Sequence, residues 1–322
     1  YQNWTDAQGK QRHIMTLLAD KIKADHVSQV TQLIADYGLN IDKITRLSGR
    51  VPLNQSNDNS MACVEFSLRG DFGDEQEVRS SLLELAGGMD VDIAVQKDNM
   101  FRRNRRLVAF DMDSTLIEAE VIDELAVEAG VGSRVAAITE AAMRGDIDFN
   151  ESFKQRLALL EGLEESALQR VAGRLKLTDG TERLLKTLKT LGFKTAIISG
   201  GFNYFARGLQ KKLGFDYIYA NELAIVKGKV TGQVVEPIIN GERKAEMLKE
   251  IAARENLTLE QVIAIGDGAN DLPMLSLAGL GIAFRAKPLV KESARQSISK
   301  HGLDSVLYLL GISDTELMQS GY

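Results

Sequence analysis

Short apolar runs alternate with amphipathic segments along the second half of the chain, and this alternation restricts the fold more than any other feature. After residue 176, segments with apolar residues at helical spacing separate apolar runs of strand length. Strands joined through helices run parallel in one sheet, which predicts an α/β fold with a helix-covered parallel sheet. The expected strands are 106–111, 193–199, 215–223, 262–267 and 280–284, the expected helices are 181–192, 203–214, 242–255 and 270–279, and a hairpin over 224–235 is expected to turn at Lys227-Gly228.

A group of helix-like segments interrupts this pattern directly after the first strand. Residues 121–175 contain four such segments and no convincing strand. We therefore expect a helical cap over 121–176, inserted into a core that is formed by residues 107–120 and 177–322.

Residues 1–100 have a different order and predict a small α+β domain. Two helices, 25–38 and 74–88, are expected among four strands. The resulting order, βαββαβ, is that of a ferredoxin-like sandwich. The expected strands are 13–20, 40–47, 61–70 and 91–96, with a polar loop over 48–60.

Four arginines lie in the segment FRRNRR, residues 101–106, between the two predicted domains. We interpret this segment as a solvated linker, with a site for an acidic partner as the alternative.

Composition excludes several classes of protein. The net charge of −6 argues against a general binder of nucleic acid or of anionic membranes, which would have an excess of basic residues. No apolar run reaches the roughly 18 residues that a membrane span needs. Cys63 is the only cysteine and is expected to be a buried small apolar residue, which fits a reducing, cytoplasmic compartment. The sequence begins at Tyr1 rather than at Met, which leaves room for an upstream segment.

Polar side chains follow three of the predicted strands. VAF is followed by Asp111 and Asp113, TAII by Ser199 and two glycines, and VIAI by the segment GDGAND, which contains Asp267, Asn270 and Asp271. Ligands of open parallel sheets bind beyond the carboxyl ends of the strands, so these groups are expected to meet in one crevice. Each motif alone is typical of a turn, a loop or a helix cap, but their shared position after apolar runs favours a site.

Four carboxylates in one crevice require a cation, and oxygen ligands beside phosphate favour Mg²⁺. Asp111 and Asp113 are two residues apart, so both side chains can face the same side of an extended strand end. One carboxylate can then attack phosphorus while the other transfers a proton. Ser199 and the Gly200 amide can donate hydrogen bonds to phosphate, and Lys244 is a candidate for balancing charge, although alone it is typical of a surface lysine.

These segments resemble the haloacid dehalogenase superfamily of phosphohydrolases, and within it the enzymes that act on phosphoserine. The resemblance spans residues 106–312 and is carried by FDMDSTLIEAEVIDELA, EAAMRGDIDFNESFKQRLALL, AIISGGF, GERKAEML and VAIGDGANDLPML with IAFRAKP. It implies that Asp111 is the nucleophile and that Asp113 is the general acid and base. It also implies that Asp111, the Asp113 carbonyl and Asp267 bind Mg²⁺.

The same resemblance implies the remaining roles. Ser199, Gly200 and Lys244 would hold the phosphate, with Asn270 at the phosphate pocket and Asp271 supporting the lysine. Glu120 would face the substrate ammonium group and Arg156 its carboxylate, while Met143 and Phe149 would close over the ligand. Without the resemblance, Arg156 is typical of a solvated helix arginine and Met143 of a core methionine.

The N-terminal domain resembles the ACT domains in its βαββαβ order and in ADYGLNI, which implies a homodimer or a site for an amino acid such as free serine. The first strand-to-helix loop departs from that family, because Lys21, Ile22, Lys23 and Ala24 stand where a glycine near a proline is usual. A structural or dimerising role and amino-acid sensing both stay open.

Two other functions also stay open: a related phosphatase or phosphotransferase that acts on another phosphorylated small molecule, and a regulatory protein that senses an amino acid.

Overall fold

The computed structural model describes residues 11–49 and 61–319, and the predicted loop 48–60 therefore lies mostly outside the described residues. The chain divides into two compact units, which are treated one at a time. The first contains Tyr1–Arg105, Asp179–Thr190 and Ile282–Tyr322, and the second contains Arg106–Thr178 and Leu191–Gly281.

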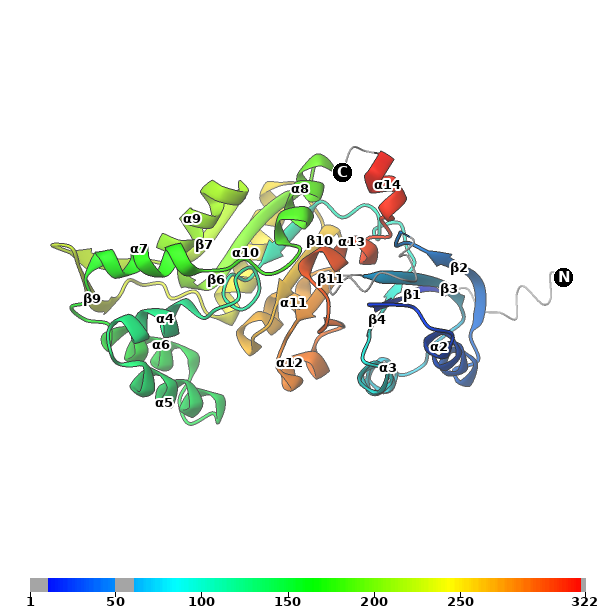
Figure 1. The fold of residues 1–322 in the computed structure, drawn as a ribbon, viewed down its shortest axis with the longest axis horizontal. Coiled ribbons are helices and arrows are strands. Elements are labelled where there is room, and N and C mark those ends of the chain that lie inside the picture. The colour runs from blue at the N-terminus through cyan, green and yellow to red at the C-terminus, as the bar shows by residue number, and fades with distance from the viewer. Residues whose placement is uncertain (1–10, 50–60, 320–322) are drawn as a thin grey trace. The chain divides into compact units, whose positions relative to one another are not determined.

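The N-terminal part of the first unit is a four-stranded antiparallel sheet with two helices (Figure 1). The strand order is β2-β3-β1-β4, which confirms the predicted βαββαβ arrangement. Helix α3 begins at Asp74, whose side chain accepts hydrogen bonds from the amides of Gln76 and Glu77. The elements are β1 Arg12–Ala19, α2 Ala24–Asp36, β2 Asn40–Arg46, β3 Ala62–Arg69, α3 Glu75–Met89 and β4 Asp92–Lys97.

The two faces of this sheet are buried in different ways. Met15, Leu17 and Ala19 alternate along β1 and belong to a core that includes Val30 and Ile34 of α2. Residues of the opposite face meet the C-terminal segment of the same unit.

Two polar contacts fix that second packing. The Gln96 side chain donates to the Leu309 carbonyl at 2.9 Å, and Asp92 lies 2.8 Å from His301 Nδ1. The sheet is therefore buried on both faces, which explains why Cys63, as predicted, is a buried free thiol.

The interpretation of residues 101–106 as a solvated linker is wrong for two of the arginines. Arg102 and Arg105 are each only 5% exposed. Arg102 pairs with Glu65 of β3, and Arg105 donates to the Arg102 carbonyl at 3.0 Å. A planar guanidinium group can be buried when such partners satisfy it, and composition alone does not reveal the partner.

The strands of the second unit form the predicted parallel arrangement, in the order β10-β5-β6-β7. Every residue of β5 and β10 is buried, because helices cover both faces of a parallel sheet. Two further strands, β11 and β12, pair in parallel with each other; most of β11 and all of β12 belong to the first unit. The strands are β5 Leu107–Phe110, β6 Lys194–Phe202, β7 Tyr217–Asn221, β10 Val262–Gly266, β11 Leu280–Phe284 and β12 Gln296–Ile298.

The helices and the hairpin also follow the prediction. The hairpin turns at Lys227 and Gly228, whose φ values of 51° and 74° lie in the left-handed region. The elements are α8 Thr181–Thr190, α9 Asn203–Leu213, β8 Leu223–Val226, β9 Lys229–Val234, α10 Gly241–Arg254 and α11 Leu272–Leu277, with short 3₁₀ turns η1 Leu259–Gln261 and η2 Ala269–Asp271.

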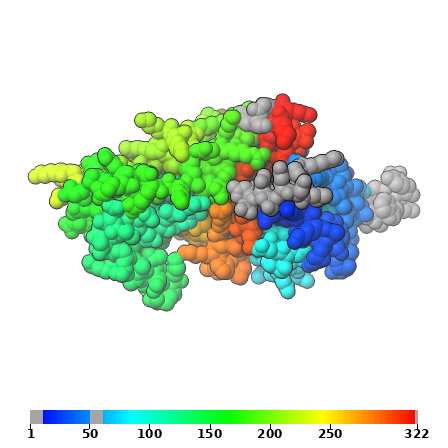
Figure 2. Space-filling view, in the orientation of Figure 1, coloured from blue at the N-terminus to red at the C-terminus, as the bar shows by residue number. Residues whose placement is uncertain are grey.

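Four helices follow β5, as predicted for residues 121–175. Helix α4 packs against both α5 and α7, and α5 packs against α6. Figure 1 shows α4, α5 and α6 grouped to one side of the parallel strands, and Figure 2 shows this part of the chain as a continuous lobe. The helices are α4 Val121–Glu128, α5 Gly132–Met143, α6 Phe149–Ala158 and α7 Glu165–Arg174.

The short elements after β11 have no counterpart in the prediction. All four residues of α13 are buried, so its sequence VLYL has no polar face that would mark a helix. These elements are α12 Pro288–Ser293, η3 Leu303–Ser305, α13 Val306–Leu309 and α14 Asp314–Gln319. Among the described residues, no helix is long and apolar enough to cross a membrane.

Candidate active site

The ends of three neighbouring strands bring the predicted polar residues together. Phe110 of β5 lies level with Ile265 of β10 on one side and with Ile197 of β6 on the other. The residues that follow each strand therefore emerge at the same edge of the sheet. This register agrees with the expectation that the polar groups after these strands lie close together.

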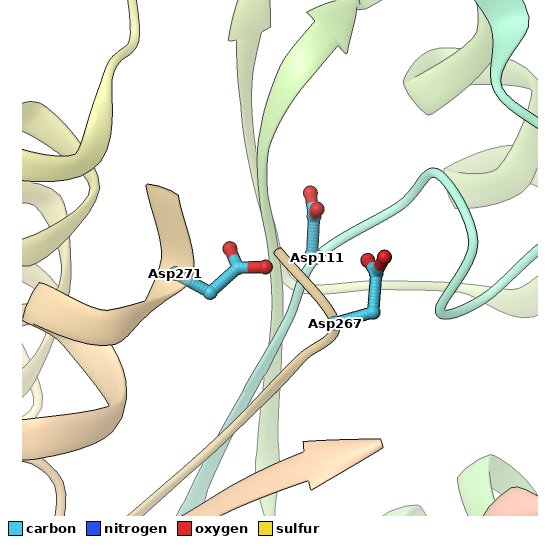
Figure 3. Close-up of side chains that lie close together, drawn as sticks. All are labelled: Asp111, Asp267 and Asp271. Carbon is cyan, nitrogen blue, oxygen red and sulfur yellow. The ribbon is translucent and has the colours of Figure 1, made fainter. Parts of the chain in front are cut away.

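Three carboxylates gather at this edge. One oxygen each of Asp111, Asp267 and Asp271 lies within 4.8 Å of the others. Figure 3 shows the side chains of Asp111 and Asp267 extending side by side from their strand ends, while Asp271 approaches from η2. Asp271 is fully buried and Asp111 is 5% exposed.

Lys244 compensates part of this negative charge. Its Nζ lies 2.9 Å from Asp111 Oδ1 and 2.6 Å from Asp271 Oδ1, and the side chain is 0% exposed. The reading of Lys244 as a surface lysine is therefore wrong. Burial alone would lower the pKa of Lys244, but the two carboxylates outweigh burial and raise it, so the group stays cationic.

The remaining negative charge is only partly balanced. Burial, followed by the charges of Asp111 and Asp271, raises the pKa of Asp267 to about 8. Burial and Asp111 raise the pKa of Asp271 to about 6. One lysine beside two buried carboxylates and half-buried Asp267 leaves a site of oxygen donors with excess negative charge, and this donor set fits a hard divalent cation.

The Asp113 carboxyl group lies beside Gly201 at the end of β6. A methyl group on Gly201 would lie 2.6 Å from Asp113 Oδ2 and 3.2 Å from Ser199 Oγ, so only glycine leaves room for the carboxyl group. Burial, and then the charges of Glu120 and Asp111, raise the pKa of Asp113 well above its usual range. A carboxyl group with a raised pKa keeps its proton to a higher pH than an exposed carboxyl group does, and it can donate that proton.

The candidate phosphate-binding residues form a second group. Ser199 Oγ accepts a hydrogen bond from the Gly201 amide at 2.9 Å and is fully buried. A methyl group on Gly200 would lie 3.1 Å from Phe149 Cζ and 3.6 Å from Asn270 Nδ2. The structure thus brings Gly200, Phe149 and Asn270 together at the end of β6.

The candidate residues for substrate recognition differ in burial: Arg156 is half-buried, whereas Met143 is exposed. Glu120 accepts a hydrogen bond from Ser114 Oγ at 2.9 Å, and its charge acts on half-buried Arg156. Burial lowers the pKa of Arg156, and the nearby acids oppose this shift. Met143 is 60% exposed, so the expectation of a core methionine is wrong, because this end of α5 does not pack into the core.

Sequence reasoning passed over Ser114, Thr115 and Asn221. Thr115 Oγ1 is 3.4 Å from Asp267 Oδ1, and Ser114 adopts a positive φ of 55° while it holds Glu120. Asn221 follows the apolar run of β7 as directly as Asp111 follows that of β5. A polar residue directly after an apolar strand run was the signal for the other site residues, and the same signal identifies Asn221.

Metal binding is expected to stabilise the protein more at high pH. Because the pKa of Asp267 is raised in the folded protein, the folded state binds more protons than the unfolded state between about pH 4 and 8, and stability without metal falls across this range. A cation held by the same oxygens competes with these protons. Mg²⁺ at about 100 times its dissociation constant at pH 8 should add about 2.7 kcal/mol to the free energy of unfolding at that pH. The same Mg²⁺ concentration should add less at pH 6, so the rise in unfolding temperature should be larger at pH 8.

Thermal unfolding with Mg²⁺ and with EDTA at both pH values measures this effect. The Asp267→Asn variant is the control and should lose the pH-dependent part of the gain. An equal Mg²⁺ effect at pH 6 and pH 8 in the unsubstituted protein would contradict the assignment of Asp267 to the cation site.

Two family models match the chain, and they agree with this geometry. Residues 108–276 match the haloacid dehalogenase-like hydrolases, and residues 11–96 match an ACT domain. The chain therefore belongs to the haloacid dehalogenase-like hydrolases, with an ACT domain at its N-terminal end.

Within this family, the chain is similar over most of its length to phosphoserine phosphatases. A phosphoserine phosphatase of Streptomyces coelicolor is 42% identical over 310 residues, which cover 96% of this chain and 73% of the relative. That of Mycobacterium tuberculosis is 41% identical over 305 residues, covering 95% of this chain and 72% of the relative.

Solved structures agree with this assignment. A crystal structure of a hydrolase of the same superfamily from Salmonella enterica has a TM-score of 0.80 at 34% identity, covering 94% of this chain and 99% of that one. A substrate-bound phosphoserine phosphatase has a TM-score of 0.61 at 42% identity, covering 63% of this chain and 97% of that one.

Proposed function

We propose that this chain hydrolyses O-phospho-L-serine to L-serine and phosphate, the last step of L-serine biosynthesis from a phosphorylated precursor, through a phosphoryl group carried on Asp111. The observation that carries the proposal is the pairing of two different carboxyl groups at one strand end. Asp111 Oδ1 lies 2.9 Å from the Lys244 ammonium group, whereas burial and nearby acids raise the pKa of Asp113 and favour its protonated form. A nucleophile and an acid are the two groups that this reaction needs.

In the first step, an oxygen of Asp111 attacks phosphorus and the bond from phosphorus to the serine oxygen breaks. Asp113 donates its proton to the departing serine oxygen. In the second step, Asp113 takes a proton from water, whose oxygen attacks phosphorus and releases phosphate from Asp111. Both side chains thereby return to their starting states, and the net reaction consumes one water for each serine and phosphate released.

We assign the cation to Mg²⁺, held by Asp111, Asp267 and the Asp113 carbonyl, with Asp271 supporting Lys244. When bound, the cation supplies positive charge to the phosphate oxygens. Ser199, Gly200 and Asn270 would donate hydrogen bonds to the same oxygens. The support from this chain is the set of clustered carboxylates with a single lysine.

The residues that we assign to recognition of the serine portion lie directly before α4, at the end of α5 and in α6. Glu120 would face the ammonium group and Arg156 the carboxylate, and an arginine can hold a carboxylate through two parallel hydrogen bonds. Phe149 and Met143 would close over the ligand as part of a cap over 121–176. The named substrate of the relatives supports this assignment.

One assay tests both the reaction and the recognition. Phosphate release from phosphoserine should exceed that from phosphothreonine and from an aryl phosphate, and EDTA should abolish all three. Arg156→Leu should raise KM for phosphoserine by about tenfold or more, because a charged bidentate contact is lost, while the aryl phosphate should be affected within about twofold. Lys154→Leu, an exposed cation on the same helix, is the matched control and should change neither value.

Different outcomes separate the alternatives. Equal rates with all three substrates would favour a general small-molecule phosphatase, and no release from any of them would favour a regulatory protein. We further propose a cytoplasmic location, in line with the single buried thiol of Cys63. The ACT domain would either join two chains as a homodimer, which sedimentation of the full chain can test, or bind free serine.

A further inference from the structure

Strand β6 leaves its ladder with β7 where it forms the candidate phosphate-binding loop. Ile198 pairs with Tyr219 and Phe202 pairs with Asn221, so three residues of β6 stand opposite one residue of β7. These three residues are Ser199, Gly200 and Gly201. Extra residues in a strand lose ladder partners for their backbone groups, so something else must hold them in place.

The Asn221 side chain holds this loop in place through hydrogen bonds. Its Nδ2 donates to the Gly200 carbonyl at 2.8 Å, and its Oδ1 accepts from the Ile239 amide at 2.8 Å. Asn221 is only 3% exposed. Its amide group is therefore satisfied on both sides, by two segments that are distant in the sequence.

The first of these bonds and a further one to Ser199 together fix the peptide plane between Gly200 and Gly201. The carbonyl of the Gly200–Gly201 peptide accepts from Asn221, and the amide of the same peptide donates to Ser199 Oγ. Because Ser199 Oγ accepts this bond, its own hydroxyl hydrogen stays available for a ligand oxygen. The orientation of the Ser199 hydroxyl thus depends on Asn221.

The second bond reaches the helix that carries Lys244. Ile239 precedes Asn240, whose side chain caps α10 by accepting from the Arg243 amide at 3.0 Å. The Lys244 amide donates to the Asn240 carbonyl at 2.9 Å. One amide side chain thereby ties the loop with Ser199 to the start of the helix with Lys244.

We propose that Asn221 is a positioning residue that sets the geometry of the phosphate pocket, and this inference rests on the proposed function. It touches neither the substrate nor the reacting atoms. It places two groups that do, the Ser199 hydroxyl and the Lys244 ammonium group, at a fixed separation. Loss of the two Asn221 hydrogen bonds should therefore lower the affinity for phosphate. The affinity for the serine portion should stay unchanged.

Asn221→Asp tests this directly, because it keeps the shape and the acceptor for the Ile239 amide but sets an oxygen against the Gly200 carbonyl. Binding of inorganic phosphate, measured by calorimetry in Mg²⁺ buffer, should weaken about tenfold or more, and kcat for phosphoserine should fall at least as far. Inhibition by free L-serine should stay within about twofold, because no serine contact is changed.

Thr195→Val is the matched control. Thr195 is a fully buried residue at the other end of β6, and its Oγ1 donates to Asp216 at 3.1 Å. The variant removes a side-chain hydrogen bond between β6 and the residue that precedes β7, at the end of β6 that is away from the pocket. It should lower the unfolding temperature but should leave both phosphate binding and kcat within about twofold.

Several outcomes would overturn the proposal. Phosphate binding by Asn221→Asp within twofold of the unsubstituted protein would do so, as would a parallel loss of serine and phosphate binding. Asn221→Ala, which introduces no charge, is measured alongside, and failure of both variants to fold would show that Asn221 only holds the fold. If the unsubstituted protein binds phosphate but does not hydrolyse phosphoserine, the proposed function fails, and the binding comparison still decides the role of Asn221.

Discussion

Asp111→Asn is expected to reduce kcat for phosphoserine by about four orders of magnitude or more, because the amide cannot act as the nucleophile. The fold should survive the change. Asparagine has nearly the same shape, and Lys244 keeps its contact with Asp271 at 2.6 Å. Loss of one charge also removes the repulsion by Asp111, which after burial is the second cause of the raised pKa of Asp267. Steady-state phosphate release and far-UV circular dichroism measure the two effects.

The control for this substitution is Asp36→Asn, at an exposed carboxylate at the end of α2. It should leave kcat within about twofold, since water screens an exposed charge and such a charge contributes little. Substantial turnover by folded Asp111→Asn protein would refute the assignment of Asp111.

Lys244→Met is expected to damage both activity and stability. The substitution leaves the buried carboxylates of Asp111 and Asp271 without their cation. Removal of one partner of a buried ion pair costs about 3–5 kcal/mol, and loss of one charge at the reacting phosphoryl group costs about two to three orders of magnitude in kcat. Denaturant unfolding in EDTA, followed at several pH values, measures the first effect.

The pH dependence of that loss has a definite sign. Without the lysine, the pKa of Asp271, which burial and Asp111 already raise, should rise further, since opposite charge no longer favours its ionised form. An acid with a raised pKa in the folded state contributes stability at low pH that is lost as the pH increases. The destabilisation should therefore be small near pH 5 and largest near pH 8.

Lys249→Met serves as the control, because Lys249 is an exposed residue of the same helix, α10. It should change stability by less than about 0.5 kcal/mol at either pH. If Lys244→Met and Lys249→Met were equally stable at pH 8 in EDTA, the buried charge cluster would not have the energetic role given to it.

Much of the fold could be read from the sequence because local patterns were consistent with it. Apolar runs such as VAF and VIAI mark strands that helices cover on both faces. The same argument places Asp111, Ser199 and Asp267 at one edge, since ends of parallel strands coincide. The register of β10, β5 and β6 agrees with it.

What the sequence could not reveal depends on contacts between distant segments. Lys244 has no distinguishing neighbour in the sequence, and only the return of α10 to the sheet edge buries it against Asp111. The burial of Arg102 depends in the same way on Glu65, which is 37 residues away. The exposure of Met143 depends on how α5 ends, which helical spacing does not specify.

Direct detection of the phosphoryl group on the protein tests the central claim most closely. The chain is mixed with ³²P-labelled phosphoserine and Mg²⁺, quenched in acid within milliseconds and digested for mass analysis. We predict acid-stable label on the peptide that contains Asp111, absent from the Asp111→Asn variant. Turnover of phosphoserine with label on another residue, or with undiminished label in Asp111→Asn, would contradict the account.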